Sequence, residues 1–297
     1  MSDEVINSVL LSPIERKRRA ELSKMVIPLL LVAPLFVFML VLYAIPVCSM
    51  LLRSVSSPSW SFVHYTALVE DVVFVKTFST TLRTSFVVTL TSLVLAYPVA
   101  LALTRARSSA PVLLILILMP FWTSILVRSY AWMVLLGRHG LINEMLSSLG
   151  IIDAPLRILN TTLASEIAMT HIMLPYMILP IANALRQIDP SLERAASALG
   201  ATPWATFYQV TFPLSMPGVA VGVLLVFVLA LGFYITPALV GDSREITISM
   251  LIAHQVDQLN WEYAATLSVV LLVTALGLIA AGQCFPGVGK AFRMNLR

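Results

Sequence analysis

Residues 25–52 read MVIPLLLVAPLFVFMLVLYAIPVCSMLL, an apolar run that contains no charged side chain. A helix needs about 20 apolar residues to cross a bilayer, so this run predicts a membrane-spanning helix. Its prolines are compatible with that interpretation, because neighbouring helices can satisfy the backbone groups that a proline frees. The run is too long for the apolar region of a cleavable signal peptide, and we expect it to be retained as the first span.

Five more apolar blocks follow, at residues 80–103, 111–136, 161–185, 213–236 and 261–284. The chain of 297 residues is 59% hydrophobic and only 11% charged, whereas soluble domains carry about 25% charged residues. We therefore predict an all-α membrane protein. Its six transmembrane helices form one domain over residues 25–285, between a polar segment at 1–24 and a basic tail at 286–297.

The distribution of basic residues predicts the orientation of these spans. Six spans place both termini on one side, and cytosolic segments are rich in Lys and Arg. With the N-terminus inside, 12 of the 19 basic residues are cytosolic, namely Arg16, Lys17, Arg18, Arg19, Lys24, Arg105, Arg107, Arg186, Arg194, Lys290, Arg293 and Arg297. Both termini are therefore expected in the cytosol. The net charge of +4 reflects this topology and does not indicate a nucleic-acid partner.

The cytosolic loop at 187–213 has local signals for two short helices; residues 189–213 read DPSLERAASALGATPWATFYQVTFP. Asp189 can cap a helix whose first residue is Pro190. Gly200 suits the left-handed residue that closes that helix. Thr202 and Pro203 repeat the cap and proline, which predicts the start of a second helix.

The first of these helices has one apolar face, because its apolar residues follow i, i+3, i+4, i+7 spacing at Leu192, Ala195, Ala196 and Leu199. A short amphipathic helix of this kind can lie on the membrane surface or insert into a groove on a partner protein. The spacing alone leaves both possibilities open.

The same loop resembles a pattern in permease subunits of ABC importers: Glu-Ala-Ala, three residues, Gly, nine residues and Ile-x-Leu-Pro. The residues that match this spacing are Ala195, Ala196, Gly200, Val210, Phe212 and Pro213. The chain departs from the pattern at the Glu, where Arg194 stands, with Glu193 directly before it. The loop also lies between the fourth and fifth of six spans, where the family has it.

Three further stretches resemble the spermidine/putrescine branch of these permeases: PFWTSILVRSY at 120–130, GLINE at 140–144 and LGFYITPAL at 231–239. The resemblance implies an importer of the bacterial inner membrane with two permease subunits (a heterodimer is expected), two cytosolic ATPase subunits and a periplasmic solute-binding protein. ATP and magnesium would bind the ATPase subunits, and this chain would hold no cofactor or metal and have no enzymatic activity.

The resemblance also implies that the loop contains a coupling helix seated in a cleft of the ATPase. The expected contact residues are Leu192, Glu193, Arg194, Ala195, Ala196, Leu199, Gly200 and Pro213. Nothing in the chain itself resembles an ATP site. The nearest sequence, from Gly287 to Lys290, lacks the spacing of a phosphate-binding loop, and no strand precedes it.

Ionisable residues inside the predicted spans are candidates for the solute pathway, because they are costly there. Glu166 in the fourth span can bind a cationic group, or pair with Arg83 or Arg128. Arg128 in the third span can bind a carboxylate or phosphonate, or pair with a carboxylate or backbone carbonyls. His171 is a pathway contact or a hydrogen-bonded packing residue.

Aromatic side chains near these residues include Trp122 and Tyr234, which can stack on a cation or pack between helices. The segment 242–262 carries four acidic residues and one arginine, so it can attract cations or dock the binding protein. We predict import of polyamine-like organic cations. The alternatives are an ABC importer for an amino-phosphonate or opine-like solute, and a secondary transporter driven by an ion gradient.

Overall fold

A computed structural model of the protein describes residues 31–56, 63–106 and 109–283. The predicted segments 1–24 and 286–297 lie outside these residues, as does Lys290. Within the described part, the first helix begins at Leu31, passes through a π-helical turn (Leu40–Ala44) and continues as α3 (Ile45–Ser56).

The other secondary-structure elements in the three described ranges are also helices. In chain order the helices are α4 (Val63–Glu70), α5 (Val72–Arg105), α6 (Ala110–Leu118), η2 (Met119–Trp122), α7 (Ile125–Leu136), α8 (Leu141–Ser148), α9 (Thr162–Arg186), α10 (Pro190–Ala198), α11 (Pro203–Thr206), η3 (Phe207–Thr211), α12 (Phe212–Leu231), α13 (Ile235–Val240), α14 (Ile248–Asp257) and α15 (Trp261–Gln283).

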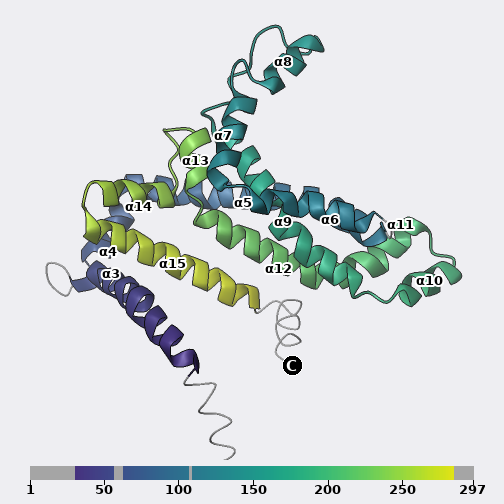
Figure 1. The fold of residues 1–297 in the computed structure, drawn as a ribbon, viewed down its shortest axis with the longest axis horizontal. Helices are drawn as coiled ribbons and strands as arrows, with labels where there is room; N and C mark the ends of the chain where they lie inside the picture. The colour runs from purple at the N-terminus through teal and green to yellow at the C-terminus, as the bar shows by residue number, and fades with distance from the viewer. Residues whose placement is uncertain (1–30, 57–62, 107–108, 284–297) are drawn as a thin grey trace, which may run out of the picture.

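The core of the molecule is formed by α5, α9 and α12, which run side by side (Figure 1). Two glycines on α12 allow its backbone to approach α9 closely. A Cβ atom at Gly218 would lie 2.4 Å from the Ala184 Cβ, and one at Gly222 would lie 2.8 Å from the Met177 sulfur. Small residues four positions apart are a common means of close helix packing in membranes. This contact fixes the spacing of the two helices.

The predicted apolar spans are present as helices. Among the described residues, five helices are long and apolar enough to cross a membrane. A bent pair, Ala110–Trp122 with Ile125–Ser148, brings the number to six if it counts as one span. The block at 111–136 is therefore not one straight helix: its two parts meet at 99°. The chain turns there because Thr123 and Ser124 are extended, and the Ser124 side chain accepts the Leu126 N–H and starts a new helix.

Two other spans begin earlier than the hydropathy of the sequence predicts. The second begins at Val72, because the Asp71 side chain accepts the backbone N–H of Val73 at 2.8 Å and caps α5. The hydroxyl of Tyr263 on α15 also donates to Asp71, at 2.7 Å. This hydrogen bond, with those from the backbone, holds the pKa of the Asp71 carboxyl below its usual range. The cap therefore also connects α5 to α15.

The fifth span begins in the cytosolic loop itself. The second short helix predicted there does not stand alone, because α11, the π-helical η3 and α12 form one helix of 29 residues, Pro203–Leu231. Pro213 is the second residue of α12 and has no N–H to donate. The π-helical turn η3 lies directly before α12. The helix ends at Leu231, since Gly232 to Tyr234 leave the helical path before α13.

The segment of α7, α8 and the return to α9, residues 125–161, is called the arm below. It leaves the bundle on the side opposite to α15 (Figure 1). The helix α10 lies at one end of the bundle, and α4 and α14 lie at the other (Figure 1).

Candidate coupling helix and solute pathway

The predicted loop helix is present as α10, with the predicted ends. Asp189 accepts the backbone N–H of Ser191 at 2.8 Å, and this bond holds the pKa of the Asp189 carboxyl below its usual range. Gly200 adopts φ +85°. Its N–H donates to the Ser197 carbonyl and the Ala201 N–H to the Ala196 carbonyl, each at 3.0 Å. This is the geometry by which a left-handed glycine closes a helix.

The surface around α10 is apolar and exposed. The helix itself buries none of its residues. Leu192 is exposed, and Leu199 is 90% exposed. Trp204, at 71%, and Tyr208, at 59%, add aromatic rings from α11 and η3. The sequence analysis missed these two rings, although their i, i+4 spacing after the Thr202 cap was a readable signal.

Glu193 connects α10 to the base of α12. Its carboxylate accepts a hydrogen bond of 2.7 Å from the hydroxyl of Thr211, which is buried at the end of η3. Arg194, which stands where the family pattern has Glu, is exposed. Ala196 is half-buried, and Ala195 and Pro213 are exposed. The carboxylate of Glu193, which stands next to the pattern's Glu position, therefore binds Thr211 of the same chain.

An aromatic cluster continues this connection to α5. The Tyr97 ring lies 5.9 Å from that of Phe207 and 5.8 Å from that of Phe212, centroid to centroid. Its hydroxyl is 2.8 Å from the Ser215 hydroxyl. Hydrogen bonds and ring contacts thus join α10, through η3, to the core helices α12 and α5.

A charged cluster lies toward the other end of the bundle. The Arg83 guanidinium on α5 is 3.9 Å from Glu166 on α9 and 3.9 Å from Glu245, which precedes α14. The Thr162 hydroxyl donates to Glu245. The Glu166 side chain is 12% exposed and that of Arg83 58%. Glu166 was expected to pair with Arg83 or Arg128, and in the structure it pairs with Arg83. The carboxylates of Glu166 and Glu245 share this guanidinium.

Arg128 and His171 form a second polar group, where α7 meets α9. The Trp132 indole N–H donates to His171 Nδ1 at 3.3 Å, and the two rings make an edge contact. The Nε of Arg128 is buried and has no hydrogen-bond partner among the described residues. His171 is thus a hydrogen-bonded residue, whereas the buried Nε of Arg128 is a donor without a partner in the described part of the chain.

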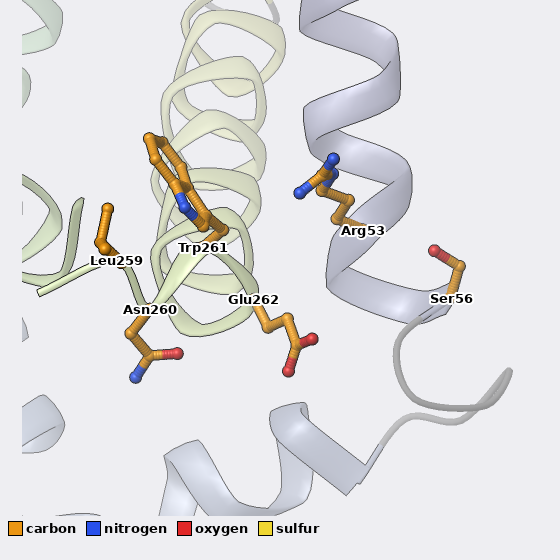
Figure 2. A pocket seen from close by; sticks show the side chains of 6 residues that line it. All are labelled: Arg53, Ser56, Leu259, Asn260, Trp261 and Glu262. Carbon is orange, nitrogen blue, oxygen red and sulfur yellow. The ribbon is translucent and has the colours of Figure 1, made fainter.

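The aromatic candidates lie elsewhere. Trp122 is exposed in η2, at the break between α6 and α7, and Tyr234 is exposed directly before α13. Figure 2 shows a separate pocket between the ends of α3 and α15, into which Arg53 and Glu262 project. No group of three or more His, Cys, Asp or Glu in the described ranges is arranged to hold a metal ion.

Residues 14–283 match the family described as "Binding-protein-dependent transport system inner membrane component". The chain belongs to this family. It is therefore a permease component located in the inner membrane, as predicted, and the predicted resemblance to importer permeases is confirmed.

Individual relatives support the same assignment. The chain is 36% identical over 200 residues to the spermidine/putrescine transport system permease protein PotB of Haemophilus influenzae, covering 67% of this chain and 70% of that one. It is 35% identical over 218 residues to PotB of Escherichia coli, covering 73% and 78%. A bacterial ABC transporter that imports the acidic polysaccharide alginate has the same fold, with a TM-score of 0.71, 18% identity, and 92% and 99% of the two chains covered.

Proposed function

We propose that this permease imports polyamine-like organic cations, which an external binding protein delivers. The observation that carries the proposal is the identity of 35–36% to permeases named for spermidine and putrescine transport, over about two thirds or more of both chains. The charged cluster agrees with it, because Glu166 and Glu245 outnumber Arg83 and can attract an ammonium group.

The proposed assembly contains a second permease subunit, two cytosolic ATPase subunits that bind ATP and magnesium, and a periplasmic binding protein. A solved relative, the bacterial alginate ABC transporter, is in complex with a pentasaccharide-bound periplasmic protein. The surface of Leu192, Leu199, Gly200 and Trp204 is exposed and apolar, which suits insertion into a groove on an ATPase. In this assembly α10 and both termini face the cytosol.

Movement of the ATPase pair would displace α10 as a rigid piece. Glu193 would transmit the displacement to Thr211 and α12, and the ring contacts of Tyr97 would transmit it to α5. A rigid-body change of helix packing of this kind alternates between discrete states. Ala195, Ala196 and Arg194 complete the contact surface, and Pro213 starts the span that moves.

The proposed solute pathway uses groups from several helices. Glu166 supplies a carboxylate for an ammonium group. Trp122 and Tyr234 supply exposed aromatic faces, which attract cations. His171, held by Trp132, borders the pathway at α7.

A second candidate is an anionic or zwitterionic solute, such as an amino-phosphonate. It is favoured by Arg128, whose buried Nε has no partner in the described part of the chain. A carboxylate or phosphonate oxygen would satisfy that donor.

The decisive experiment is a ligand panel on the binding protein of this transporter, combined with uptake by the complete transporter in proteoliposomes. Spermidine and putrescine should bind, and uptake should require ATP. Binding of amino-phosphonates without polyamines would select the second candidate. Uptake that continues without ATP, under an imposed ion gradient, would overturn the importer mechanism.

A further inference from the structure

The pocket in Figure 2 lies at the ends of two candidate membrane spans. It is lined by the end of the first span, Leu31–Ser56, and by the start of the last one, Trp261–Gly282. Its charged residues, Arg53 and Glu262, directly adjoin the apolar runs of these two helices. Charged side chains are disfavoured in hydrocarbon, whereas apolar runs favour it. The pocket therefore lies at the level of the lipid headgroups.

The lining of this pocket combines a cation with an anion. The Arg53 guanidinium projects into it from α3, which also supplies the Ser56 hydroxyl, and the Glu262 carboxylate projects from α15, beside Trp261 (Figure 2). Arg53 forms no ion pair with any residue of the described ranges, so its charge can act on a ligand. The volume of about 520 Å³ falls within the roughly 300–1,000 Å³ of small-molecule sites.

The two charges favour a zwitterionic ligand. A purely cationic group would be repelled by Arg53, and a purely anionic one by Glu262. A phosphate accepts paired hydrogen bonds from a guanidinium, and a primary ammonium donates to a carboxylate. A phosphoethanolamine group carries both charges on either side of a short ethylene link. The Trp261 ring can also attract the ammonium group.

The pocket also has an apolar side chain on a strained backbone. Leu259 adopts φ +60° and is 72% exposed. It closes α14, since its N–H donates to the Val256 carbonyl and the Asn260 N–H to the Gln255 carbonyl, each at 2.9 Å. Glycine is the usual residue at such a helix end, and a bulky residue there is strained. Strained residues gather at functional sites, and an exposed leucine suits the apolar part of a ligand.

Beyond the pocket, α3 and α15 pack against each other and offer apolar surface to acyl chains. Val47 and Leu52 are exposed on α3, and Leu272 and Val273 are exposed on α15. The most apolar stretch of the first span contains no buried residue. A lipid held by the pocket would therefore join the first span to the last.

We propose that this pocket binds the headgroup of phosphatidylethanolamine. The phosphate lies against Arg53 and Ser56, the ammonium against Glu262 and Trp261, and the glycerol part against Leu259. The same charges occur in soluble phosphoethanolamine and in amino-phosphonates. The lipid is the better match, because the pocket adjoins apolar surface on both helices. This inference is independent of the solute that the transporter imports.

Lipid binding to the complete transporter tests the proposal. The purified transporter is delipidated in detergent and titrated with the dioleoyl forms of phosphatidylethanolamine, phosphatidylcholine and phosphatidylglycerol, and native mass spectrometry measures bound lipid. We expect phosphatidylethanolamine to bind most tightly. Arg53→Gln and Glu262→Gln should each weaken its binding by about tenfold, the factor implied by loss of one charged hydrogen bond. The matched controls Arg157→Gln and Glu144→Gln, at exposed charges of the arm, should leave it unchanged.

Headgroup preference separates a binding role from a structural one. Glu262→Gln should abolish the preference for phosphatidylethanolamine over phosphatidylglycerol, because the amide neither pairs with an ammonium nor repels an anionic lipid. Equal affinity of the unmodified transporter for the three lipids would overturn the proposal. Stabilisation by soluble phosphoethanolamine equal to that by the lipid would also overturn it, in favour of a solute site.

A further variant keeps the test decisive if the charge variants fail to fold. Leu259→Gly relieves the left-handed strain, so thermal unfolding of the lipid-free transporter should occur at no lower temperature. The same variant should bind phosphatidylethanolamine severalfold more weakly, because the apolar contact is lost. Unchanged lipid binding in Leu259→Gly and in the charge variants that fold would contradict the assignment of the pocket.

Discussion

Substitutions at Gly200 separate two reasons why a glycine closes the coupling helix. Gly200 adopts φ +85°, and a Cβ atom built on it meets no atom within 4 Å. An added side chain therefore has room, and its effect comes from backbone strain or from contact with a partner. The left-handed conformation costs a residue with a Cβ about 1–2 kcal/mol, which reduces the population of the closed helix end by roughly 5- to 30-fold.

Three variants divide these contributions. Gly200→Ala introduces the backbone strain without a charge. We expect uptake to fall by up to roughly 5- to 30-fold, in proportion to the population of the closed helix end. Gly200→Asn tolerates the left-handed conformation and should retain most uptake. Gly200→Asp also tolerates it but places a charge on the proposed docking surface, so we expect loss of uptake with normal membrane insertion.

The chain offers a matched control at Gly150. This glycine has φ +68°, is equally open, and closes α8 with the same two backbone hydrogen bonds, from Gly150 and Ile151. The assays are uptake in cells and solute-stimulated ATP hydrolysis by the purified transporter. Gly150→Asp should leave the ATPase bound, whereas Gly200→Asp should release it. Normal uptake by Gly200→Asp would refute the assignment of α10 as the coupling helix.

Four other predictions concern single groups. Glu166→Gln should raise the KM for cation uptake about tenfold, since it removes a charge at the proposed pathway. A reporter fused after Arg297 should be cytosolic in a topology assay. Glu193→Gln and Thr211→Val should each lower the solute imported per ATP, because a hydrogen bond to a charged group contributes about 1.5–3 kcal/mol, and their effects should not add. The pKa of the Asp71 carboxyl is lowered in the folded protein, so the ionised carboxylate stabilises the fold above its usual pKa of about 3.9, and this stabilisation is lost as the pH falls below that value. The melting temperature in detergent should therefore fall in acid. The fall should be smaller in the variant Asp71→Asn.

Each of these predictions has an outcome that contradicts it. An equal acid loss of melting temperature in Asp71→Asn and in the unmodified protein would show that the Asp71 cap does not contribute. Unchanged kinetics in Glu166→Gln, beside an unchanged control Glu144→Gln on the exposed arm, would leave Glu166 as a structural partner of Arg83. A periplasmic reporter would mean an odd number of spans. Additive effects of the Glu193 and Thr211 changes would show that the two groups act separately.

Hydropathy and capping chemistry predicted most of the fold, because these signals lie within one segment of sequence. The helix α10 begins and ends where Asp189, Pro190 and Gly200 indicate. The apolar blocks became helices because the bilayer imposes their length. The end of the fifth span was misplaced at Thr236, since Gly232 ends α12 and the following apolar residues form α13.

The candidate site was harder to predict, because its contacts join residues far apart in the sequence. Glu245 appeared only as one acid in an outer loop, and the fold brings it to Arg83 beside Glu166. The hydrogen bond from Thr211 to Glu193 depends on the π-helical turn η3, and the spacing of apolar residues does not predict a π-helical turn. The break at Thr123 follows an apolar run that reads as one span.

The contacts of Glu193 and Tyr97 at the coupling end differ from the ion pairs of Arg83, and this difference bears on where the structure yields to a displacement of α10. At the coupling end, Glu193 and Tyr97 make hydrogen bonds of 2.7–2.8 Å to Thr211 and Ser215, so α10 and α12 should move together. In the charged cluster, Arg83 lies 3.9 Å from each of its carboxylates, beyond hydrogen-bond distance. Its side chain is 58% exposed, and solvent weakens ion pairs of this kind. A displacement imposed at α10 is thus passed to α12 and α5 by hydrogen bonds, and the longer ion pairs that join Arg83 on α5 to Glu166 and Glu245 resist it less. We therefore expect the helices to separate first at that cluster, where the proposed cation would replace the guanidinium as the partner of the two carboxylates.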